Sequence, residues 1–353
     1  MMSWEDNVRK VVPYTPGEQP QNPNVIKLNT NECPYPPAPG VAKALQSFQA
    51  DTLRLYPDPA ATDLTKALAD YYGVKQSEVF VGVGSDDVLA MIFMTFFNSK
   101  KPLLFPDITY SFYDVWADLF RIPYRQIPLN DEFEINKEDY IGKECGGIIF
   151  PNPNAPTGVL VDLAFIEDIV KANPDVIVVV DEAYIDFGGI SALPLIQKYD
   201  NLLVVQTFSK SRAMAGIRIG YAFGCEKLIK YMSDVKFSFN SYTMNRPALS
   251  LGVEAVRDDA YFKEIVGKIV NTREWAKKEL KELGFVFKDS MSNFIFATHP
   301  DYDIVNIFEE LRKRDIYVRH FNGERIKDYL RITIGTDEEM KTLINTIKEI
   351  VAC

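Results

Sequence analysis

The sequence predicts an α/β protein with a doubly wound, mostly parallel sheet in a large domain and a second, smaller α+β domain. Three observations support this prediction. Short runs in the middle of the chain are apolar at every position, they alternate with segments of helical spacing, and the last hundred residues change to charged amphipathic helices separated by short strands. With 353 residues, 47% of them hydrophobic, the chain is long enough for two domains.

The apolar runs are expected to be the strands of the large sheet. They cover residues 79–83, 102–105, 147–150, 176–180 and 202–205. A strand that is apolar on both faces is typical of the centre of a parallel sheet, because helices cover both sides of such a sheet. Residues 86–97 and 163–172 have helical spacing, so the middle of the chain consists of repeated strand–helix units.

We expect three segments along the chain: an N-terminal arm that starts the small domain (1–45), the large domain (46–250) and the rest of the small domain (251–353). The first forty residues are rich in Pro and Gly, which disfavours helix and leaves one short strand at 25–28. In the last segment we expect helices at 261–283, 304–314 and 338–351, and strands at 285–287, 293–297, 316–319 and 330–334. The small domain is therefore predicted to be discontinuous.

Composition excludes several classes of protein. The formal net charge of −10, from 39 Lys plus Arg against 49 Asp plus Glu, disfavours binding to nucleic acid or to an anionic membrane. The longest apolar run, 88–97, is half the length of a membrane-spanning helix. The N-terminus has neither a basic region nor an apolar signal core, so we expect a cytoplasmic protein.

The chain has few histidines that could bind a metal. Two histidines, His299 and His320, argue against a His-rich metal site or a histidine-based nucleophile, and we expect no metal. The cysteines lack zinc-ligand spacing and are expected to be free, buried thiols in a reducing compartment. They are Cys33, Cys145, Cys225 and Cys353.

Polar residues that directly follow apolar runs are the candidates for catalysis, because ligands of parallel sheets bind at the carboxyl ends of the strands. Asp181 follows a buried run and is desolvated, unless it caps the next helix. Ser209-Lys210 follows the apolar run at 202–205. Burial there would lower the pKa of the lysine amine and make it nucleophilic. The alternative is a solvated lysine at the start of a helix. With Tyr184 nearby, Asp181 and Lys210 suggest a pyridoxal phosphate site, which needs a lysine and an acid.

A phosphate cradle is expected at Gly82-Val83-Gly84-Ser85, between the first apolar run and the helix that opens at Asp86. Free backbone N–H groups and the Ser85 hydroxyl would hold the phosphate at the helix N-terminus. Ser85 as a plain helix cap is the alternative, and the spacing does not match a dinucleotide fingerprint. Of Asp86 and Asp87, at least one must point away from a phosphate.

Two further side chains fit this site. Arg218 lies between Gly216 and Gly220, which would permit close backbone approach, and its guanidinium is suited to clamping a phosphate. Tyr110 follows another short strand, where its ring would stack on a pyridine; ordinary packing is the alternative.

Taken together, the sequence resembles the fold type I pyridoxal-phosphate aminotransferases, and among them most closely the histidinol-phosphate aminotransferases. The resemblance covers nearly the whole chain. Its most specific stretches are 28–32 (Leu-Asn-Thr-Asn-Glu), 54–58 (Arg-Leu-Tyr-Pro-Asp), 152–158, 181–184 (Asp-Glu-Ala-Tyr), 207–220 and 330–336. The subfamily is indicated by Pro13-Tyr14 with 16–20, by the Tyr-Pro-Asp segment, and by Arg319 ahead of Arg331.

The resemblance implies a role for each candidate residue. Lys210 would hold the cofactor and shuttle a proton, Asp181 would keep the pyridine nitrogen protonated, and Tyr184 would hydrogen-bond the phenolic oxygen. The remaining cofactor contacts would come from Gly84, Ser85, Asp86, Thr207, Ser209 and Arg218 near the phosphate, from Tyr110 on the ring, and from Tyr56, which resembles a tyrosine that reaches the neighbouring subunit's cofactor. A homodimer with sites at its interface is therefore implied.

One position departs from the family pattern. The family has Asn directly before Pro-Thr-Gly, where it also contacts the phenolic oxygen, but here that position is Ala155. Either Asn154 takes this role or Tyr184 fulfils it alone.

The implied reaction is the transamination of histidinol phosphate and 2-oxoglutarate to imidazole-acetol phosphate and glutamate in histidine biosynthesis. Arg331 resembles the arginine that binds the substrate α-carboxylate, while Arg319, Tyr14 and Asn29 are candidates for the substrate phosphate; an exposed strand charge is the alternative for Arg319. The arm that carries Tyr14 would close over the site. Rival functions are an aromatic amino-acid aminotransferase, a threonine-phosphate decarboxylase, and a non-catalytic ligand-sensing regulator on the same fold.

Overall fold

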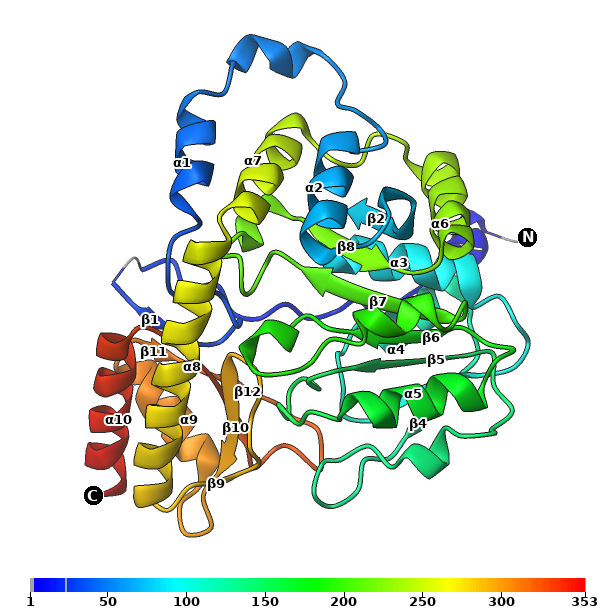
Figure 1. Ribbon diagram of the computed structural model, residues 1–353. Helices are drawn as coiled ribbons and strands as arrows, with labels where there is room; N and C mark the ends of the chain where they lie inside the picture. Colours follow the sequence, from blue (N-terminus) through cyan, green and yellow to red (C-terminus); the bar gives the residue numbers. More distant parts are fainter. Residues whose placement is uncertain (1–2, 23, 353) are drawn as a thin grey trace.

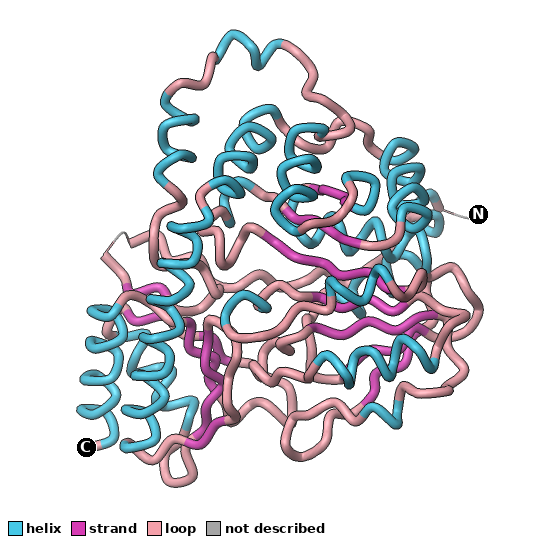
Figure 2. Tube along the Cα trace, in the orientation of Figure 1, coloured by secondary structure: helices cyan, strands magenta, loops and turns pink. Residues whose placement is uncertain are grey.

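The computed structural model describes residues 3–22 and 24–352, which form a seven-stranded sheet, a four-stranded sheet and a two-stranded sheet (Figures 1 and 2). The large sheet contains β2 (Val79–Gly82), β3 (Leu103–Pro106), β4 (Tyr124–Ile127), β5 (Gly147–Pro151), β6 (Val178–Asp181), β7 (Leu202–Thr207) and β8 (Gly220–Phe223). Its strand order is β2-β8-β7-β6-β5-β3-β4, and β8 runs antiparallel to both of its neighbours. The other pairings are parallel, so the predicted fold class is confirmed.

Strand residues alternate between two hydrophobic cores, one on each face of this sheet. On β6, Val178 and Val180 belong to one core and Val179 to the other, and all three are fully buried. Helices α2 (Thr62–Tyr72), α5 (Leu163–Ala172) and α7 (Arg246–Arg257) cover the first face. Helices α3 (Gly84–Phe96), α4 (Tyr113–Phe120) and α6 (Glu226–Phe239) cover the second. This two-sided burial explains why the strands are apolar at every position.

The smaller part of the molecule combines antiparallel strands with three helices. Its four-stranded sheet has the order β12-β13-β10-β9, formed by β9 (Val286–Phe287), β10 (Phe294–Thr298), β12 (Arg319–His320) and β13 (Leu330–Thr333). Helices α8 (Asp259–Glu282), α9 (Ile304–Lys313) and α10 (Asp337–Val351) pack with these strands around a third core (Figure 1). The strand expected at 316–319 is divided: β11 (Ile316–Tyr317) pairs with β1 (Ile26–Lys27), and β12 pairs with β13.

The expectation that the first forty residues lack helix is wrong at both ends. A 3-10 turn, η1, spans Trp4–Asn7, and helix α1 (Pro39–Gln46) begins with Pro39 in its first turn. Proline is accepted there because the first helical N–H groups have no intrahelical partner. The other 3-10 turns are η2 (Ala50–Arg54), η3 (Gln76–Glu78), η4 (Lys137–Asp139), η5 (Ile185–Phe187), η6 (Leu193–Gln197) and η7 (Ala215–Ile217).

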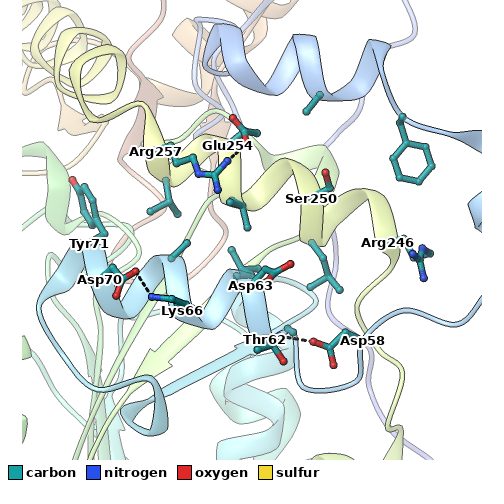
Figure 3. A pocket seen from close by; sticks show the side chains of 18 of the residues that line it. Asp58, Thr62, Asp63, Lys66, Asp70, Tyr71, Arg246, Ser250, Glu254 and Arg257 are labelled. Carbon is teal, nitrogen blue, oxygen red and sulfur yellow. Dashed lines mark hydrogen bonds and ion pairs between the residues drawn. The ribbon is translucent and has the colours of Figure 1, made fainter.

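The segment that joins α1 to α2 arches away from the molecule, at the top of Figure 1. Between α1, α2 and α7 lies a pocket of about 1060 Å³ (Figure 3). Its charged groups include the pairs Lys66–Asp70 and Arg257–Glu254.

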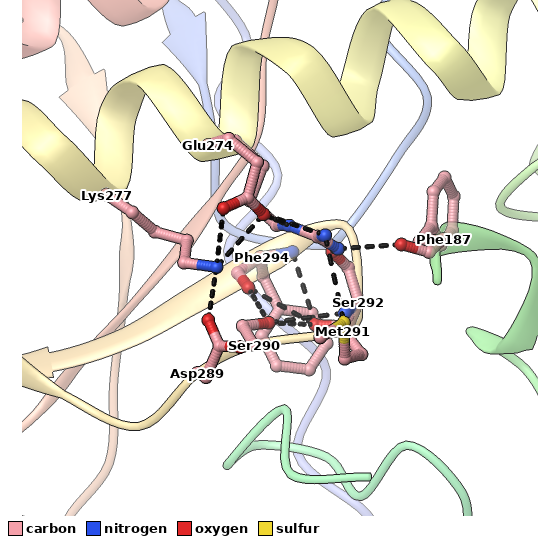
Figure 4. Close-up of polar contacts among 9 residues, drawn as sticks. Phe187, Glu274, Lys277, Asp289, Ser290, Met291, Ser292 and Phe294 are labelled. Atoms are coloured by element: carbon pink, nitrogen blue, oxygen red, sulfur yellow. Dashed lines mark hydrogen bonds and ion pairs between the residues drawn. The ribbon is translucent and has the colours of Figure 1, made fainter. Parts of the chain in front are cut away.

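A network of polar contacts around Glu274, Ser292 and the Phe187 carbonyl joins α8 to the η5 turn and to the strand β10 region (Figure 4). Arg273 on α8 is 2% exposed and donates from Nη1 to the backbone carbonyls of Phe187 (2.8 Å) and Ser292 (2.9 Å). Glu274 pairs with both Arg273 and Lys277. Because Phe187 ends the η5 turn that follows Tyr184, this network links the large sheet to the strand β10 region.

Cys33, Cys145 and Cys225 are free thiols, as expected, but only Cys145 is fully buried, and the expectation of burial is wrong for the other two. Cys353 lies outside the described residues. Within the described ranges, the side chains form no group of three or more His, Cys, Asp or Glu residues arranged to hold a metal ion. In the same ranges, every helix is too short or too polar to cross a membrane.

Candidate active site

A cavity of about 360 Å³ lies at the carboxyl ends of the central strands. Many of the residues expected from the sequence line it together: Ser85, Asp86, Tyr110, Asp181, Tyr184, Thr207, Ser209, Lys210 and Arg218. They come from the ends of β6 and β7 and from the connections that adjoin β2, β3, β6, β7 and β8 at one edge of the sheet. A volume of this size suits a small organic ligand.

Lys210 lies in the connection after β7, and its Nζ donates a hydrogen bond to the backbone carbonyl of Thr30 at 3.0 Å. Desolvation in the cavity, followed by the positive charge of Arg331, lowers the pKa of Lys210 from 10.5 to about 8. An amine with such a pKa is available in its neutral form near neutral pH, as a nucleophile and as a base.

Asp181 is the last residue of β6 and is 4% exposed. Its Oδ2 accepts a hydrogen bond from the Tyr113 hydroxyl (2.9 Å), and its Oδ1 accepts one from the Ala183 N–H (3.2 Å). Burial raises the pKa of Asp181 from 3.8 to about 6, although both hydrogen bonds favour the carboxylate. A cationic partner in the cavity would therefore be favoured electrostatically, because it would offset this desolvation.

The cradle is built where α3 meets β8. Helix α3 begins at Gly84, earlier than expected, and Gly84 has a left-handed φ of 82°. A Cβ on Gly84 would lie 2.4 Å from Arg218 Nη2, and a Cβ on Gly220 would lie 2.2 Å from the Ser85 nitrogen. Both glycines thus allow the helix N-terminus, Arg218 and Ser85 to lie close together, as an anion site requires. A Cβ on Gly216 would meet nothing within 4 Å, so only one of the two glycines that flank Arg218 is needed for close approach.

The two aspartates of α3 point in different directions, as required. Asp87 turns back and accepts a hydrogen bond from the Val83 N–H at 2.9 Å. Asp86 faces the cavity, where it pairs with Arg218 (3.0 Å) and accepts a hydrogen bond from the Tyr110 hydroxyl (2.6 Å). The Arg218 guanidinium is therefore held at the cradle by a carboxylate from the facing helix.

Hydroxyl groups complete this end of the cavity. Thr207 Oγ1 accepts a hydrogen bond from the Ser209 N–H at 3.1 Å and donates to Ser209 Oγ at 3.0 Å. These contacts fix the backbone immediately before Lys210.

Asn154 does not lie in the cavity. Its side-chain Nδ2 donates to the Ile108 carbonyl and to Thr157 Oγ1, both at 3.0 Å, whereas Ala155 lines the cavity wall. These contacts do not support the hypothesis that Asn154 substitutes for the family asparagine, which stays a prediction. Tyr184 instead receives a hydrogen bond from Asn31 Nδ2 at 2.9 Å, a contact that the sequence does not predict.

The candidates for binding substrate lie outside the cavity lining, on the arm and the small sheet. Arg331 donates from Nη2 to the Asn29 carbonyl at 3.0 Å, and the Asn29 side chain donates to the Glu18 carbonyl at 2.8 Å. Asn29 thereby holds the arm, although its Oδ1 is buried without a hydrogen-bond partner among the described residues. The Tyr14 ring stacks on Phe112, with 4.1 Å between the centroids.

Tyr56 does not line the cavity of its own chain. It lies on the arch before α2, is 78% exposed, and its ring packs against Tyr242 with centroids 4.6 Å apart.

The site also contains Thr30, Asn31, Glu32 and Tyr113, which the sequence does not single out as candidates. Thr30 and Glu32 line the cavity, and Lys27 and Thr30 hold the pKa of the Glu32 carboxyl below its usual value despite desolvation. Three of the four belong to the stretch 28–32, whose only signal is its resemblance to the family. No local sequence pattern marks these residues, because their contacts join distant parts of the chain. Tyr113, for example, bonds Asp181, which is 68 residues away.

Comparison with known proteins identifies the family. The sequence profile described as "Aminotransferase class I and II" matches residues 23–347. The chain belongs to this aminotransferase family. It is 53% identical over 348 residues to a histidinol-phosphate aminotransferase of Lactococcus lactis subsp. cremoris (strain MG1363), with 99% of this chain and 98% of the relative covered. A second relative with that name, from Brachyspira hyodysenteriae, is 51% identical, with 98% of each chain covered.

The fold agrees with this assignment. The crystal structure of a histidinol-phosphate aminotransferase from Sinorhizobium meliloti, in complex with pyridoxal 5′-phosphate, superposes with a TM-score of 0.82 at 25% identity, covering 93% of this aminotransferase and 91% of that chain. Enzymes of the family depend on pyridoxal 5′-phosphate. The residues present suit that cofactor, because one cavity combines the Lys210 amine, the Asp181 carboxyl and a glycine-lined helix N-terminus.

Proposed function

We propose that this aminotransferase interconverts histidinol phosphate and 2-oxoglutarate with imidazole-acetol phosphate and glutamate, in L-histidine biosynthesis. The observation that carries the proposal is the placement of the Lys210 amine and the buried Asp181 carboxyl in one cavity, in a chain 53% identical to an enzyme of that name. The cofactor, when bound, supplies a pyridine ring that withdraws electrons from the carbon bearing the substrate's amino group.

We assign the proton transfers to Lys210. Its Nζ would take the proton from the substrate carbon and return it to the cofactor, and a pKa lowered to about 8 suits an amine that must both accept and donate. The Thr30 carbonyl, 3.0 Å away, is positioned to orient the amine.

We assign Asp181 to hold the proton on the pyridine nitrogen. The carboxylate is costly in this buried position, so pairing with a protonated ring would restore its ordinary ionised state. Tyr113 fixes the carboxylate orientation through a 2.9 Å hydrogen bond.

Gly84, Ser85, Thr207, Ser209 and Arg218 would bind the cofactor phosphate. The free N–H groups of α3 and the Arg218 guanidinium provide positive charge at one end of the cavity. Tyr110 would stack on the ring, while its hydroxyl remains bonded to Asp86.

A pair of arginines supports a substrate with two anionic groups. Arg319 on β12 and Arg331 on β13 are direct cross-strand partners. We propose that Arg331 binds a carboxylate and Arg319 a phosphate, with Tyr14 closing over them from the arm. The arm is already near: Gly17 lies beside Arg319, and Glu18 pairs with Arg312 at 2.9 Å.

We propose a homodimer with sites at the subunit interface. The occupant that suits the arch and the pocket between α1, α2 and α7 is a second copy of this chain, because the arch exposes large apolar side chains. Leu53 is 58% exposed and Tyr56 78%. Tyr56 would then reach the partner's cofactor phosphate.

We also propose that residues 1–45 and 251–353 form one domain and 46–250 another. The parallel pairing of β1 with β11, and the bond from the Thr333 N–H to the Leu28 carbonyl (3.0 Å), support the grouping of the arm with the C-terminal part. A cytoplasmic location is proposed as well, since three thiols are free, as in reducing compartments.

Purified protein loaded with pyridoxal 5′-phosphate should be assayed by mass spectrometry with histidinol phosphate, phenylalanine and O-phosphothreonine, each with 2-oxoglutarate. We expect imidazole-acetol phosphate and glutamate from the first substrate, and no product from the Lys210→Ala variant. Turnover of phenylalanine or decarboxylation of phosphothreonine without turnover of histidinol phosphate would reject the proposal. A ligand-sensing regulator would bind these compounds without turnover.

A further inference from the structure

Asn31 lies at the junction between the arm and the small sheet, in a backbone conformation that few residues adopt. It is 1% exposed and has a left-handed φ of 56°, which asparagine and glycine tolerate best. Its N–H donates to Thr333 Oγ1 (3.0 Å), and its carbonyl accepts from Asn293 Nδ2 (3.1 Å). The residue is therefore held firmly by strand β13 and by the loop before β10.

The hydrogen bonds also fix which way the Asn31 amide points. Thr333 Oγ1 accepts the Asn31 N–H, so its own hydrogen is free to be donated to Asn31 Oδ1, 3.0 Å away. With Oδ1 occupied as an acceptor, the amide nitrogen faces Tyr184 and donates to Oη at 2.9 Å. The Tyr184 oxygen thus receives a hydrogen bond, and its own hydrogen has no acceptor among the described residues.

Tyr184 lines the cavity, with Lys210 Nζ 5.8 Å from its ring centroid. Because donation to a hydroxyl oxygen strengthens that hydroxyl as a donor, the Asn31 contact prepares Tyr184 to donate into the cavity. Burial raises the pKa of Tyr184, and the bond from Asn31 acts in the opposite direction.

Ala155 lines the same cavity but offers no polar atom, and the neighbouring Asn154 is bonded elsewhere. We propose that Asn31 is a positioning residue that supplies the amide absent at Ala155, acting through Tyr184 on the phenolic oxygen of pyridoxal 5′-phosphate. This inference rests on the proposed cofactor binding and adds a contribution from the N-terminal arm to it.

A pH titration of the bound cofactor measures this contact. Other charges act on Tyr184 and the cavity as well: Glu32, Lys210, Asp181, Asp86, Arg218 and Arg331. They are unchanged in Asn31→Gly and in the Thr333 variants, so a difference among these variants reports the Asn31–Tyr184–cofactor contact, whereas Asn31→Asp also adds a negative charge.

Asn31→Gly removes the amide while keeping the left-handed backbone free of strain. In the holoenzyme we expect the midpoint of the visible absorption change to rise by about half a pH unit, because a weaker bond to the phenolic oxygen disfavours its ionised form. Asn31→Asp retains size and the bond from Thr333 but replaces the donor by an acceptor, so it should raise the midpoint at least as much. An unchanged midpoint in both variants would overturn the proposal.

Thr333 provides the matched pair of controls. Thr333→Val removes the hydroxyl that orients the Asn31 amide and should shift the midpoint upward, whereas Thr333→Ser retains the hydroxyl and should titrate like the wild type. A shift in Thr333→Ser equal to that in Thr333→Val would reduce Asn31 to a structural role and overturn the inference. If no variant, wild type included, shows a bound-cofactor absorption band, the proposed function itself fails instead.

Discussion

Arg319 and Arg331 lie directly opposite each other on the antiparallel strands β12 and β13, and each guanidinium carbon lies 5.6 Å from the centroid of the Phe321 ring. Like charges in this arrangement destabilise a sheet. Burial lowers the pKa of Arg331. Tyr184 acts in the opposite direction, and the positive charge of Arg319 lowers the pKa further. A site that keeps two opposed cations close together is suited to a ligand with more than one negative charge.

Replacing Arg319 with Gln should separate the two substrates. We expect KM for histidinol phosphate to rise about 10- to 100-fold, since a charge-assisted hydrogen bond is lost, while KM for glutamate changes much less. Arg331→Gln should raise KM for both substrates. Steady-state kinetics test this, with Arg314→Gln, a partly exposed arginine at the end of α9, as the control. Equal effects of Arg319→Gln on both substrates would contradict the assignment.

Lys210→Ala should abolish transamination and leave a folded protein that still binds cofactor reversibly. Borohydride reduction of the wild type followed by peptide mapping should place a pyridoxyl group on Lys210. A label on any other lysine would refute the assignment of Lys210.

Asp181→Asn should stabilise the cofactor-free protein at neutral pH. Because the folded-state pKa of about 6 exceeds the ordinary 3.8, the folded protein holds the proton more tightly between these values, and the free energy of unfolding falls as pH rises through this window. The variant should therefore gain about 1 to 3 kcal/mol at pH 7.5 and little near pH 4. Urea unfolding at both pH values measures this, with Asp131→Asn, at an exposed aspartate in the turn after β4, as the control. Cofactor affinity should fall in the same variant, and an equal gain at both pH values would contradict the argument.

Gly220→Ala should weaken cofactor binding by more than about tenfold and destabilise the fold by about 1–3 kcal/mol, because its Cβ would strike the Ser85 backbone. Gly267→Ala on α8, where a Cβ meets nothing within 4 Å, should instead stabilise the protein by about 0.5–1 kcal/mol. Fluorescence titration with cofactor and thermal unfolding distinguish the two. Normal cofactor affinity in Gly220→Ala would show that the cradle does not depend on this contact.

Mixing two inactive variants should restore activity if Tyr56 serves the neighbouring subunit. In a heterodimer of Lys210→Ala and Tyr56→Ala chains, one site combines an intact lysine with an intact partner tyrosine. After random exchange of subunits we expect about a quarter of the wild-type activity. Activity no higher than the sum of the separate variants would indicate that Tyr56 acts within its own chain or not at all.

The sequence predicts the central strands well because two-sided burial leaves an unbroken apolar run, as in 176–180 and 202–205. It does not reveal β4, whose Tyr-Arg-Gln-Ile pattern is typical of a half-exposed edge, or β8, whose start is obscured by Gly220. Helix α5 has the bounds that the sequence predicts, since Asp162 caps it and its apolar spacing is regular.

For the site, residues directly after strands can be found because their position in the sequence determines their position in space. Asn31 and Tyr113 cannot be found in this way, because each matters through a contact with a distant residue. Asn31 bonds Tyr184, 153 residues away, and Tyr113 bonds Asp181, 68 residues away. Asn154 shows the opposite difficulty: it lies next to the expected position in the sequence, but its Nδ2 donates to Thr157 Oγ1 and the residue does not line the cavity.

The reversed direction of β8 has a consequence for how this enzyme tolerates change. Because β7 ends and β8 begins at the same edge of the sheet, the connection from 208 to 219 never crosses the molecule, and it carries both Lys210 and Arg218. A slip of β8 by one residue would move Arg218 and the Gly220–Ser85 contact together while Lys210 stayed anchored to β7. Insertions in this connection would therefore uncouple the phosphate end of the site from its amine, whereas insertions in the opposite loops of the sheet would leave the distance between them unchanged.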